Sequence, residues 1–309
     1  MPELPEVQIT VNGLNKTVKN KAIKDVWSDY FLNTKNKSKE NIKNKKYFEL
    51  FKKKIIGERI KGVGRRGKNI LIHLTNNKTI LVHMKMTGHF LYGKYRVVAS
   101  SQYKVAKKNT WEAVEPKELK DPFNKFIHLV FTLSNNKHLA FSDMRKFAKI
   151  FLFDTHLKNK IKDLSLLGPE PLPNISLQTF TKQFLNRPNG KIKTVLMDQT
   201  VVAGIGNIYS DEILWTAGIH PERKTSELKT EEIKKMWLAT KKILNSSIKM
   251  GGDSMSDYRN INGEKGDFQE LHNVYRKTGE KCLKKGCGGI IKRKIIGGRS
   301  GHFCNIHQK

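Results

Sequence analysis

The sequence from Asn69 to Met84, NILIHLTNNKTILVHM, consists of two apolar runs on either side of the polar pair Asn76-Asn77. Apolar runs of about four to eight residues that are bounded by turn-forming residues are typical of β-strands. We therefore expect a β-hairpin here, with strands at residues 69–74 and 79–84.

Similar short segments lie on both sides of this hairpin, separated by turn residues such as Asn135-Asn136. They are Ile55–Val63, Phe126–Leu133, His138–Phe141 and Ala148–Phe153. Several short strands at this spacing predict a β-sandwich or a barrel. Residues 94–125 are polar and poorly periodic, and we expect a long inserted loop there.

Helical patterns flank the strands. Val7, Val11, Leu14 and Val18 recur at the helical spacing, so residues 4–20 are expected to form an amphipathic helix. The lysine- and asparagine-rich stretch that follows is expected to be a surface loop. The later run LGPEPLP, which begins at Leu167, interrupts regular structure and is typical of a linker.

Beyond this run the pattern is helical. Apolar stripes at helical spacing are formed by Leu177, Phe180 and Phe184, by Ile208, Ile213, Leu214 and Trp215, and by Ile233, Trp237, Leu244 and Ile248. Thr230 is a candidate N-cap of the last helix, and Gly251-Gly252 is expected to end it. The expected organisation is a β-sandwich domain at 1–155, a linker at 156–175, a helical domain at 176–275 and a small Cys/His unit at 276–309.

The charge is strongly positive, with 59 Lys+Arg against 28 Asp+Glu, a net charge of +31 and a pI near 10.0. Such a field attracts polyanions, which makes nucleic acid the leading partner. An AT-rich coding bias is an alternative source of part of the lysine excess. No apolar run reaches the roughly 18 residues of a membrane span, and no secretion signal is visible. We expect an intracellular protein without a membrane partner.

The N-terminus reads MPELPE, and removal of Met1, which a small second residue permits, leaves Pro2 with a secondary amine. An α-amino group has a pKa of about 7.7–8.0, so part of it is neutral and nucleophilic near pH 7. Attack of such an amine on a sugar C1′ gives an iminium cation that acidifies the C2′ proton. Glu3 and Glu6 are candidate proton-transfer groups. The alternative is that Pro2-Glu3 is only a favourable helix start.

The C-terminal unit has the pattern Cys282-x4-Cys287-x16-Cys304-x2-His307. Two close ligand pairs separated by a hairpin-length spacer suit one tetrahedral, structural zinc ion. The residues between the pairs alternate as two strands joined by a glycine-rich turn. His302 competes with His307 for the fourth ligand position, and three unrelated reduced cysteines are the alternative to a metal site.

The run Pro2–Val7 closely resembles the N-terminal signature of the formamidopyrimidine-DNA glycosylase/endonuclease VIII family, which are bifunctional DNA glycosylases and AP lyases that excise oxidised bases. Further resemblances follow in order along nearly the whole chain. They are Arg65–Lys68, the His-x-x-Met-x-Gly loop at His83–Gly88, Asp143–Phe147, the linker at Leu167–Leu172 and the helix–two-turn–helix turn at Asp198–Tyr209. Each segment alone is weakly specific, but the ordered set is highly specific.

The resemblance implies roles for the matched residues. Pro2 is the nucleophile, and Lys68 is the family's catalytic lysine. Met86, Arg145 and Phe147 fill the gap that a flipped nucleotide leaves in the duplex. An apolar wedge, a cation and an aromatic ring suit a hole that is partly stacked and partly hydrogen-bonding. For Met86 and Phe147 the alternative is ordinary core packing.

Contacts to DNA are implied at four further positions. Asn207 lies in the turn Gly204–Asn207, where glycines and a helix N-terminus favour a phosphate. Arg299 matches the family's finger arginine, and Lys193 and His128 are further candidate contacts. For the glycines, the alternative to a phosphate site is a tight turn. For Lys193, the alternative to a DNA contact is an ordinary solvated side chain.

The region Gly252–Phe268 resembles the family's loop that folds over a flipped purine lesion. This resemblance, and the presence of Leu4 rather than glycine after Glu3, favour the formamidopyrimidine branch of the family. Met144 stands where the family usually has proline and Lys85 where it has glycine, and residues 94–125 are longer than expected. Both oxidised purines and oxidised pyrimidines therefore stay open as the preferred lesion.

We therefore predict an α+β protein with an N-terminal β-sandwich and flanking helices, followed by a helical helix–two-turn–helix domain with a zinc-finger hairpin. The predicted monomer acts on double-stranded DNA with oxidised bases or abasic sites, through a Pro2 Schiff base and β,δ-elimination, with Glu3 assisting proton transfer. One alternative is a catalytically inactive damaged-DNA-binding protein that retains Met1. The other is a structural RNA-binding protein, which gives no reason for the Pro-Glu start.

Overall fold

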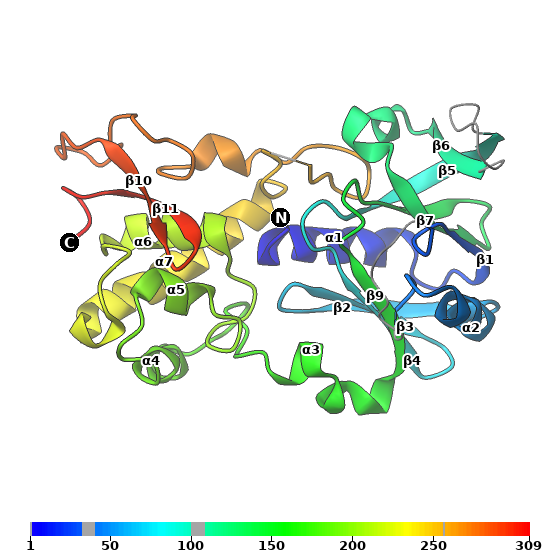
Figure 1. Ribbon diagram of the computed structural model, residues 1–309, viewed down its shortest axis with the longest axis horizontal. Coiled ribbons are helices and arrows are strands. Elements are labelled where there is room, and N and C mark those ends of the chain that lie inside the picture. The colour runs from blue at the N-terminus through cyan, green and yellow to red at the C-terminus, as the bar shows by residue number, and fades with distance from the viewer. Residues whose placement is uncertain (1, 33–40, 100–108, 256) are drawn as a thin grey trace. The chain divides into compact units, whose positions relative to one another are not determined.

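The computed structural model describes residues 2–32, 41–99, 109–255 and 257–309. Its contacts divide the chain into two units (Figure 1). Unit 1 contains residues 1–2, 6–160 and 251–267, and unit 2 contains residues 3–5, 161–250 and 268–309. The chain thus changes unit at residue 161, inside the segment in which we expected a linker. Residues 251–267, which we expected in the helical domain, pack with unit 1.

Unit 1 contains two antiparallel sheets. The four-stranded sheet has the order β2 (Ile60–Arg66), β3 (Asn69–Leu74), β4 (Lys78–His83) and β9 (Lys149–Asp154). The five-stranded sheet has the order β1 (Ile23–Ser28), β7 (Ile127–Leu133), β8 (His138–Ser142), β5 (His89–Ala99) and β6 (Asn109–Glu115). The predicted hairpin is present, because β3 and β4 pair from Asn69↔His83 to His73↔Thr79.

The core of unit 1 draws on both sheets and on two helices, α1 (Leu4–Thr17) and α2 (Lys45–Ile55). Val7, Val11 and Leu14 of α1 are buried in it, as their helical spacing predicted. Strand side chains alternate between the two faces of a sheet, so Ile72 of one sheet and Phe131 of the other turn toward the same apolar cluster. The predicted β-sandwich with flanking helices is confirmed.

Helix α2 was not predicted from the sequence. Its N-cap is Asn44, whose side-chain oxygen accepts a hydrogen bond from the Tyr47 N–H at 3.0 Å. Phe51 and Ile55 bury one face of the helix, while lysines cover the rest. Ile55 therefore ends a helix, and the strand expected from this residue begins only at Ile60.

The expectation of a loop at residues 94–125 is wrong for the described part of that segment. Strand β5 continues to Ala99, β6 pairs with it, and two short 3₁₀ helices follow, η1 (Lys117–Lys120) and η2 (Pro122–Asn124). A second apolar cluster, which includes Tyr95, Leu119 and Val130 with Trp111 packed against it, holds this hairpin to the sheet. The strand pattern of β5 and β6 was not recognised in the sequence, because polar residues lie between the apolar ones.

Unit 2 is mainly helical, with a C-terminal hairpin. Its helices are α3 (Lys162–Ser165), α4 (Leu177–Leu185), α5 (Ile192–Met197), α6 (Asn207–Ala217) and α7 (Thr230–Lys249), and its strands are β10 (Ile291–Ile296) and β11 (Arg299–Cys304). Three 3₁₀ helices complete the chain: η3 (Thr155–Lys160) in unit 1, and η4 (Thr225–Glu227) and η5 (Phe268–Leu271) in unit 2. The N-cap of α7 is Lys229 rather than Thr230. The predicted stripes of α4, α6 and α7 meet in one core, except for Leu177, which is only partly buried, and Trp215, which packs against a separate cluster around Cys304.

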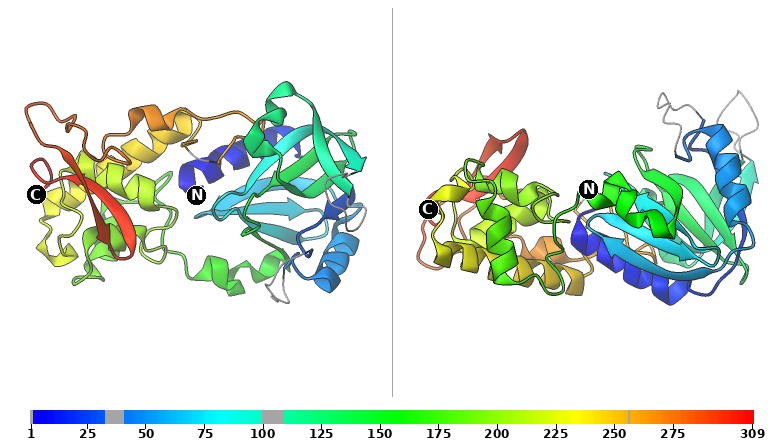
Figure 2. Two further views of the ribbon diagram at one scale, coloured as in Figure 1. Left: turned by 45° about the horizontal axis from the view of Figure 1, so that its top comes forward. Right: turned by 90° about the horizontal axis from the view of Figure 1, so that it is seen from below.

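The β10–β11 hairpin packs on the helices of unit 2 (Figure 2, red). Its turn residues Gly297 and Gly298 have φ values of 56° and 76°. A Cβ on Gly297 would lie 2.3 Å from Cγ2 of Thr194 in α5, so only glycine permits this close approach. Within the described residues, no helix is long and apolar enough to cross a membrane.

Candidate functional site

Met86, Arg145 and Phe147 come together on the surface of unit 1. The Arg145 guanidinium lies 4.5 Å from the ring centroid of Phe147, and its Nη1 lies 3.0 Å from Sδ of Met86. Met86 is 41% exposed and Phe147 is 47% exposed. Core packing, the alternative for these two residues, is therefore excluded. The structure gathers a flexible apolar side chain, a cation and an aromatic ring into one exposed group, which we call the exposed trio.

The buried carboxylate of Asp143 holds the two loops that carry the exposed trio. Its Oδ2 accepts hydrogen bonds from Tyr30 OH and from the Ala148 N–H, both at 2.9 Å. Its Oδ1 accepts from Thr87 Oγ1 at 2.5 Å, and the same Thr87 oxygen accepts from the Arg145 N–H at 3.1 Å. Asp143 is fully buried. It therefore fixes the loop around Met86 relative to the loop of Arg145 and Phe147.

Tyr30 and Thr87 support the loops of the exposed trio through Asp143, and the sequence did not reveal this. Burial, and then the neighbouring charge of Asp143, raises the pKa of the Tyr30 phenol well above its ordinary value. The phenol therefore stays protonated and continues to donate to the carboxylate. Thr87 lies inside a matched motif, which was the only available signal. Tyr30 is 113 residues from Asp143 in sequence and offered none.

Asp29, next to Tyr30, supports the same loop. Its backbone and side-chain oxygens both accept from Nζ of Lys146 at 3.3 Å. Its Oδ1 also lies 2.7 Å from Nδ1 of His128. The histidine that we expected near DNA is thus oriented by a carboxylate through one ring nitrogen, and its contact to DNA stays a prediction.

Pro2 is buried and lies two residues before Leu4, the first residue of α1. Glu6, in the first turn of α1, is 1% exposed and belongs to unit 1. Its Oε1 accepts from the Asp253 N–H at 2.9 Å, and its backbone oxygen accepts from Tyr258 OH at 3.1 Å. Glu6 therefore connects the helix that follows Pro2 to the segment 251–267.

Glu3 binds the start of helix α6 in unit 2. Its Oε2 accepts from the Gly206 N–H at 2.6 Å and its Oε1 from the Ile208 N–H at 3.0 Å. A carboxylate at a helix N-terminus satisfies amides that have no partner within the helix and is favoured by the helix dipole. The N-terminal segment of the chain is thus fixed from Glu3 onward.

Several backbone amides in and after the glycine turn before α6 already have partners within the protein. Two amides at the start of the helix already bind Glu3, and the Gly204 N–H donates to Oε1 of Gln199 at 2.8 Å. Gly204 has φ +96°, and a Cβ there would lie 2.7 Å from the side chain of Leu4. Asn207 keeps a buried Oδ1 that has no hydrogen-bond partner among the described residues. Its contact to DNA stays a prediction.

Lys68 and Lys193 are both buried but differ in position. Lys68, 7% exposed, lies with Gly67 in the turn between β2 and β3. Lys193 is fully buried, and its Nζ lies 2.6 Å from Oδ1 of Asp211 and 3.0 Å from Oγ of Ser210. A phosphate contact does not fit this burial, so we no longer propose one for Lys193. The residue holds α5 to α6 instead.

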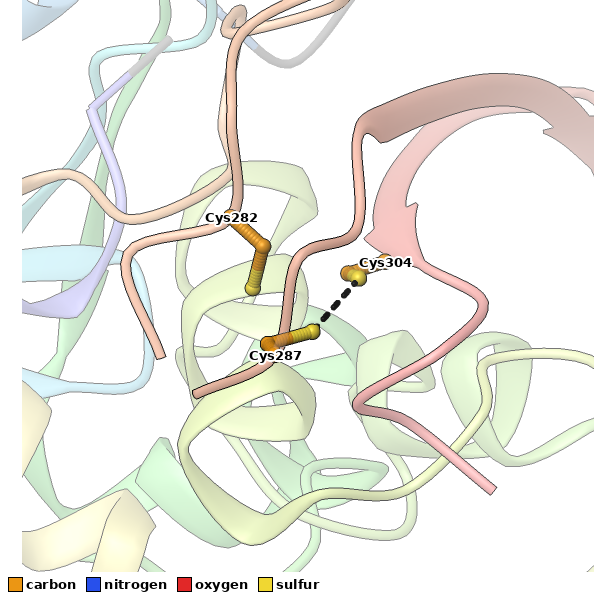
Figure 3. A group of neighbouring side chains, drawn as sticks. All are labelled: Cys282, Cys287 and Cys304. Carbon is orange, nitrogen blue, oxygen red and sulfur yellow. Dashed lines mark hydrogen bonds between the residues drawn. The ribbon is translucent and has the colours of Figure 1, made fainter. Parts of the chain in front are cut away.

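The three cysteines converge in unit 2 (Figure 3). The Sγ atoms of Cys282, Cys287 and Cys304 all lie within 4.8 Å of one another, and those of Cys287 and Cys304 are 3.5 Å apart. None forms a disulfide. A Cβ on Gly289 would lie 2.5 Å from Sγ of Cys304, so the chain passes the thiols at a residue without a side chain. Three converging thiols form a donor set suited to a soft metal ion.

The two candidate histidines have different surroundings. Nδ1 of His302 lies 2.9 Å from Oδ2 of Asp211, the carboxylate that also binds Lys193. Nε2 of His307 lies 2.7 Å from the backbone oxygen of Trp215, and the Nε1–H of that tryptophan points at Sγ of Cys282 at 3.4 Å. His307 is therefore linked to the thiols through Trp215 and is not in the group of ligand atoms that lie within 4.8 Å of one another, whereas His302 belongs to a buried ion-pair network.

Arg299 is exposed at the first position of β11, directly after the glycine turn. Unit 1 carries the exposed trio and Pro2, and unit 2 carries the helix–two-turn–helix, the thiol cluster and Arg299. These are the features that the sequence resemblance leads us to expect in a class of DNA-repair enzyme, the DNA glycosylases built on a helix–two-turn–helix.

Comparisons with known proteins identify the family. The N-terminal domain of formamidopyrimidine-DNA glycosylase matches residues 1–150, and the H2TH domain of the same enzyme matches residues 167–259. The formamidopyrimidine-DNA glycosylase of Bacillus cereus is 35% identical over 308 residues, which cover 100% of this chain and 99% of that protein. The enzyme of Bacillus subtilis is 36% identical and covers 98% of each chain.

Solved structures agree with these matches. The Lactococcus lactis enzyme in complex with DNA containing an abasic site has a TM-score of 0.80 at 30% identity, with 99% of each chain covered. A mutant of that enzyme in complex with Fapy-dG DNA has a TM-score of 0.79 at 30% identity, with 100% covered. The chain belongs to the formamidopyrimidine-DNA glycosylase family. These matches do not favour an inactive damage-binding protein or a structural RNA-binding protein.

Proposed function

We propose that the protein removes oxidised bases from double-stranded DNA and then cleaves the abasic strand. The observation that supports this most directly is the exposed trio, because it brings an apolar, a cationic and an aromatic side chain into mutual contact on the surface. An extruded nucleotide leaves a hole in the duplex that costs a few kcal/mol to open. Met86, Arg145 and Phe147 supply the apolar, cationic and aromatic contacts that stabilise the opened state.

The proposed chemistry begins with the neutral amine of Pro2. Its nitrogen forms a bond to C1′ while the damaged base leaves, and the C1′–O4′ bond then opens to give an iminium cation. Loss of a C2′ proton expels the 3′-phosphate in β-elimination, and a second elimination expels the 5′-phosphate. Water finally releases Pro2 from the sugar fragment, so that the enzyme is regenerated.

The other catalytic assignments follow from the family resemblance and from the contacts of each group. Two amides at the start of α6 hold the carboxylate of Glu3 in a fixed position, and for this carboxylate we propose assistance in ring opening and proton transfer. Glu6 is committed to Asp253, and we assign it to positioning of α1. For Lys68 we propose polarisation of the reacting site or a grip on phosphate, and for Arg299 a contact to phosphate at the lesion.

Lesion preference can be measured directly with three duplexes that contain formamidopyrimidine, 8-oxoguanine or thymine glycol. Because residues 252–268 are similar to the family's loop over flipped purines, we expect at least about tenfold higher kcat/KM on the two purine lesions, a difference of about 1.4 kcal/mol. Incision of an abasic duplex serves as the common reference. A preference for thymine glycol would contradict the purine assignment.

We further propose that the thiols and His307 hold one structural Zn²⁺. The carbonyl oxygen of Trp215 can only accept, so Nε2 of His307 must carry the proton, which leaves a lone pair on Nδ1. A metal-binding histidine commonly donates its other N–H to a carbonyl in this way. A bound ion would fix the loops at the base of the β10–β11 hairpin, because a unit this small has little core of its own.

Replacement of the metal by Co²⁺ tests this ligand set by absorption spectroscopy. We expect a tetrahedral spectrum with three thiolates, and in His307→Cys about one-third more thiolate charge-transfer intensity, because a fourth thiolate is added. His302→Ala is the matched control and should leave the spectrum unchanged, because that ring is held by Asp211. A spectrum that changes in His302→Ala and not in the His307 variant would reverse the assignment.

A further inference from the structure

The segment Gly251–Asp267 packs with unit 1, although the chain before and after it belongs to unit 2. Apart from residue 256 it is described, and it contains no helix or strand. The Asp253 N–H and Tyr258 OH donate to Glu6 in the first turn of α1, and a Cβ on Gly252 would lie 3.1 Å from Oε1 of Glu6. The segment therefore lies directly against the helix that follows Pro2.

Arg259 lies in this segment, and at 1% exposure it is among the largest fully buried side chains of the described residues. Its Nε donates to Oδ2 of Asp121 at 3.2 Å, and its Nη1 donates to the backbone oxygen of Tyr258 at 2.9 Å. The guanidinium lies 4.7 Å from the ring centroid of Phe123. Burial of a charged group costs several kcal/mol unless it is paired and hydrogen-bonded. The pocket for Arg259 supplies both requirements.

Asn124 makes a second connection to the same segment. Its Nδ2 donates to the backbone oxygens of Glu118 at 3.1 Å and Gly263 at 3.2 Å. Because both partners are carbonyls, the amide orientation is fixed, and Oδ1 faces Nε2 of His89 at 3.0 Å. Gly263 has φ +91°, and a Cβ there would lie 2.7 Å from the Glu118 oxygen. The fit requires glycine at this position.

Both connections come from residues within 94–125, the segment to which the sequence analysis assigned no function. Asp121, Phe123 and Asn124 belong to η2 and its N-cap, which follow the unexpected hairpin β5–β6. A third contact comes from β5 itself, where the Tyr92 N–H donates to the oxygen of Ile261 at 2.8 Å. The inserted residues therefore bind the segment at several points along its length.

We propose that residues 117–124 form a clamp that holds the segment 251–267 in place for recognition of the flipped base, with Arg259 and Asp121 as positioning residues. Ordering a free segment costs conformational entropy for every residue that becomes fixed, and the clamp makes this cost part of folding instead of part of binding. An abasic sugar has no base to recognise, so its cleavage does not need the segment. This inference rests on the proposed excision of oxidised bases.

The test compares Arg259→Met with the control Arg96→Met. Methionine keeps an apolar chain over Phe123 and leaves Asp121, which is 23% exposed, free to be hydrated. Arg96 forms an ion pair with Glu112 on the same β5–β6 hairpin, but both side chains are exposed, at 68% and 57%. Phe123→Ala is a second variant at a partly exposed position, which guards against misfolding of the first.

The variants are compared by hydrogen exchange, by base excision and by incision of an abasic duplex. In Arg259→Met and Phe123→Ala we expect faster exchange within 252–266, kcat/KM for base excision at least about tenfold lower, and incision of an abasic duplex within about twofold of the wild type. Arg96→Met should match the wild type in all three. An equal loss on the abasic duplex, unchanged exchange, or faster exchange with undiminished base excision would each overturn the proposal.

A failure of the proposed function can be distinguished from a failure of the proposed clamp. A wild-type protein that neither excises a base nor incises an abasic duplex would contradict the proposed function, whereas the exchange measurement would still report whether Arg259 holds the segment. Arg259→Lys adds a rescue test, because lysine restores the charge facing Asp121 but not the planar fork of the guanidinium. We expect exchange and base excision to recover partly and together in this variant.

Discussion

Replacement of Pro2 by glycine is expected to abolish the covalent complex that borohydride traps on DNA with an abasic site, and to lower base excision by about a thousandfold, or about 4 kcal/mol. Glycine still has an α-amine after Met1 is removed, but a primary one. Its imine must be protonated before it withdraws electrons, whereas the iminium of a secondary amine is always cationic. The measurement is gel separation of the trapped complex, with single-turnover excision.

The fold around Pro2 makes this substitution a local one. Glu3 is held by two amides of α6, and the Leu4 N–H donates to the oxygen of Gly204 at 3.0 Å. The free energy of unfolding should therefore change by no more than about 1 kcal/mol, the usual entropy cost of an added glycine. A Pro2→Leu protein, which retains Met1, is the matched control, and mass spectrometry confirms each terminus.

Two results would contradict the assignment of Pro2. Equal trapping by the Pro2→Gly protein would show that any terminal amine suffices. Excision by a protein that still carries Met1 would show that the amine is not the nucleophile. The alternative, an inactive damage-binding protein, would retain Met1 and would not excise a base. The same mass measurement therefore distinguishes this alternative from the enzyme.

The sequence predicted those parts of the fold that depend on local periodicity. The hairpin around Asn76-Asn77 and the buried face of α1 follow from apolar spacing alone. Helix α2 and strand β6 were missed because lysines or mixed polar residues interrupt their apolar positions, and burial of a few large side chains such as Phe51 and Trp111 decides the structure there. Tertiary packing overrides local propensity in such segments.

The candidate site was predicted in its residues but not in its connections. The motifs indicated Met86, Arg145 and Phe147, and the structure brings them together. The fact that the carboxylate of Glu3 occupies the start of α6 was not visible, because the two segments are more than 200 residues apart in sequence. The burial of Lys193 was missed because its partner Asp211, 18 residues further along the chain, lies on the next helix. Pairing between separate elements leaves no local signal.

Replacement of Asp143 by alanine is expected to have the second large effect. It leaves Tyr30 OH, Thr87 Oγ1 and the Ala148 N–H without their acceptor inside a buried site. Each buried donor without a partner costs about 1–3 kcal/mol, so the loss is at least about 3 kcal/mol. For a unit of about 150–250 residues this lowers the melting temperature by roughly 6–12 °C. Thermal unfolding of the variant measures it.

The same variant should also lose the ability to stabilise an opened duplex. Met86 and the pair Arg145–Phe147 lie on different loops that share Asp143 as their common acceptor, so without it the two loops move independently. A 2-aminopurine base opposite an abasic-site analogue reports insertion of side chains into the stack. We expect its fluorescence change on binding to fall at least about tenfold, while binding to undamaged duplex is retained.

Two milder variants grade the effect and decide whether Asp143 acts as a shared acceptor. Tyr30→Phe removes one donor and leaves the Ala148 bond to Oδ2, so it should cost about 1 kcal/mol. Asp143→Asn keeps one oxygen that can accept from Tyr30 and Ala148, and the Thr87 hydroxyl can rotate to accept from the new amide. The loss of unfolding free energy in Asp143→Asn should therefore lie between the losses in Tyr30→Phe and Asp143→Ala. If all three variants melt within about 2 °C of the wild type, or if the alanine variant still inserts normally into the stack, the two loops are held by other contacts and Asp143 is not their common support.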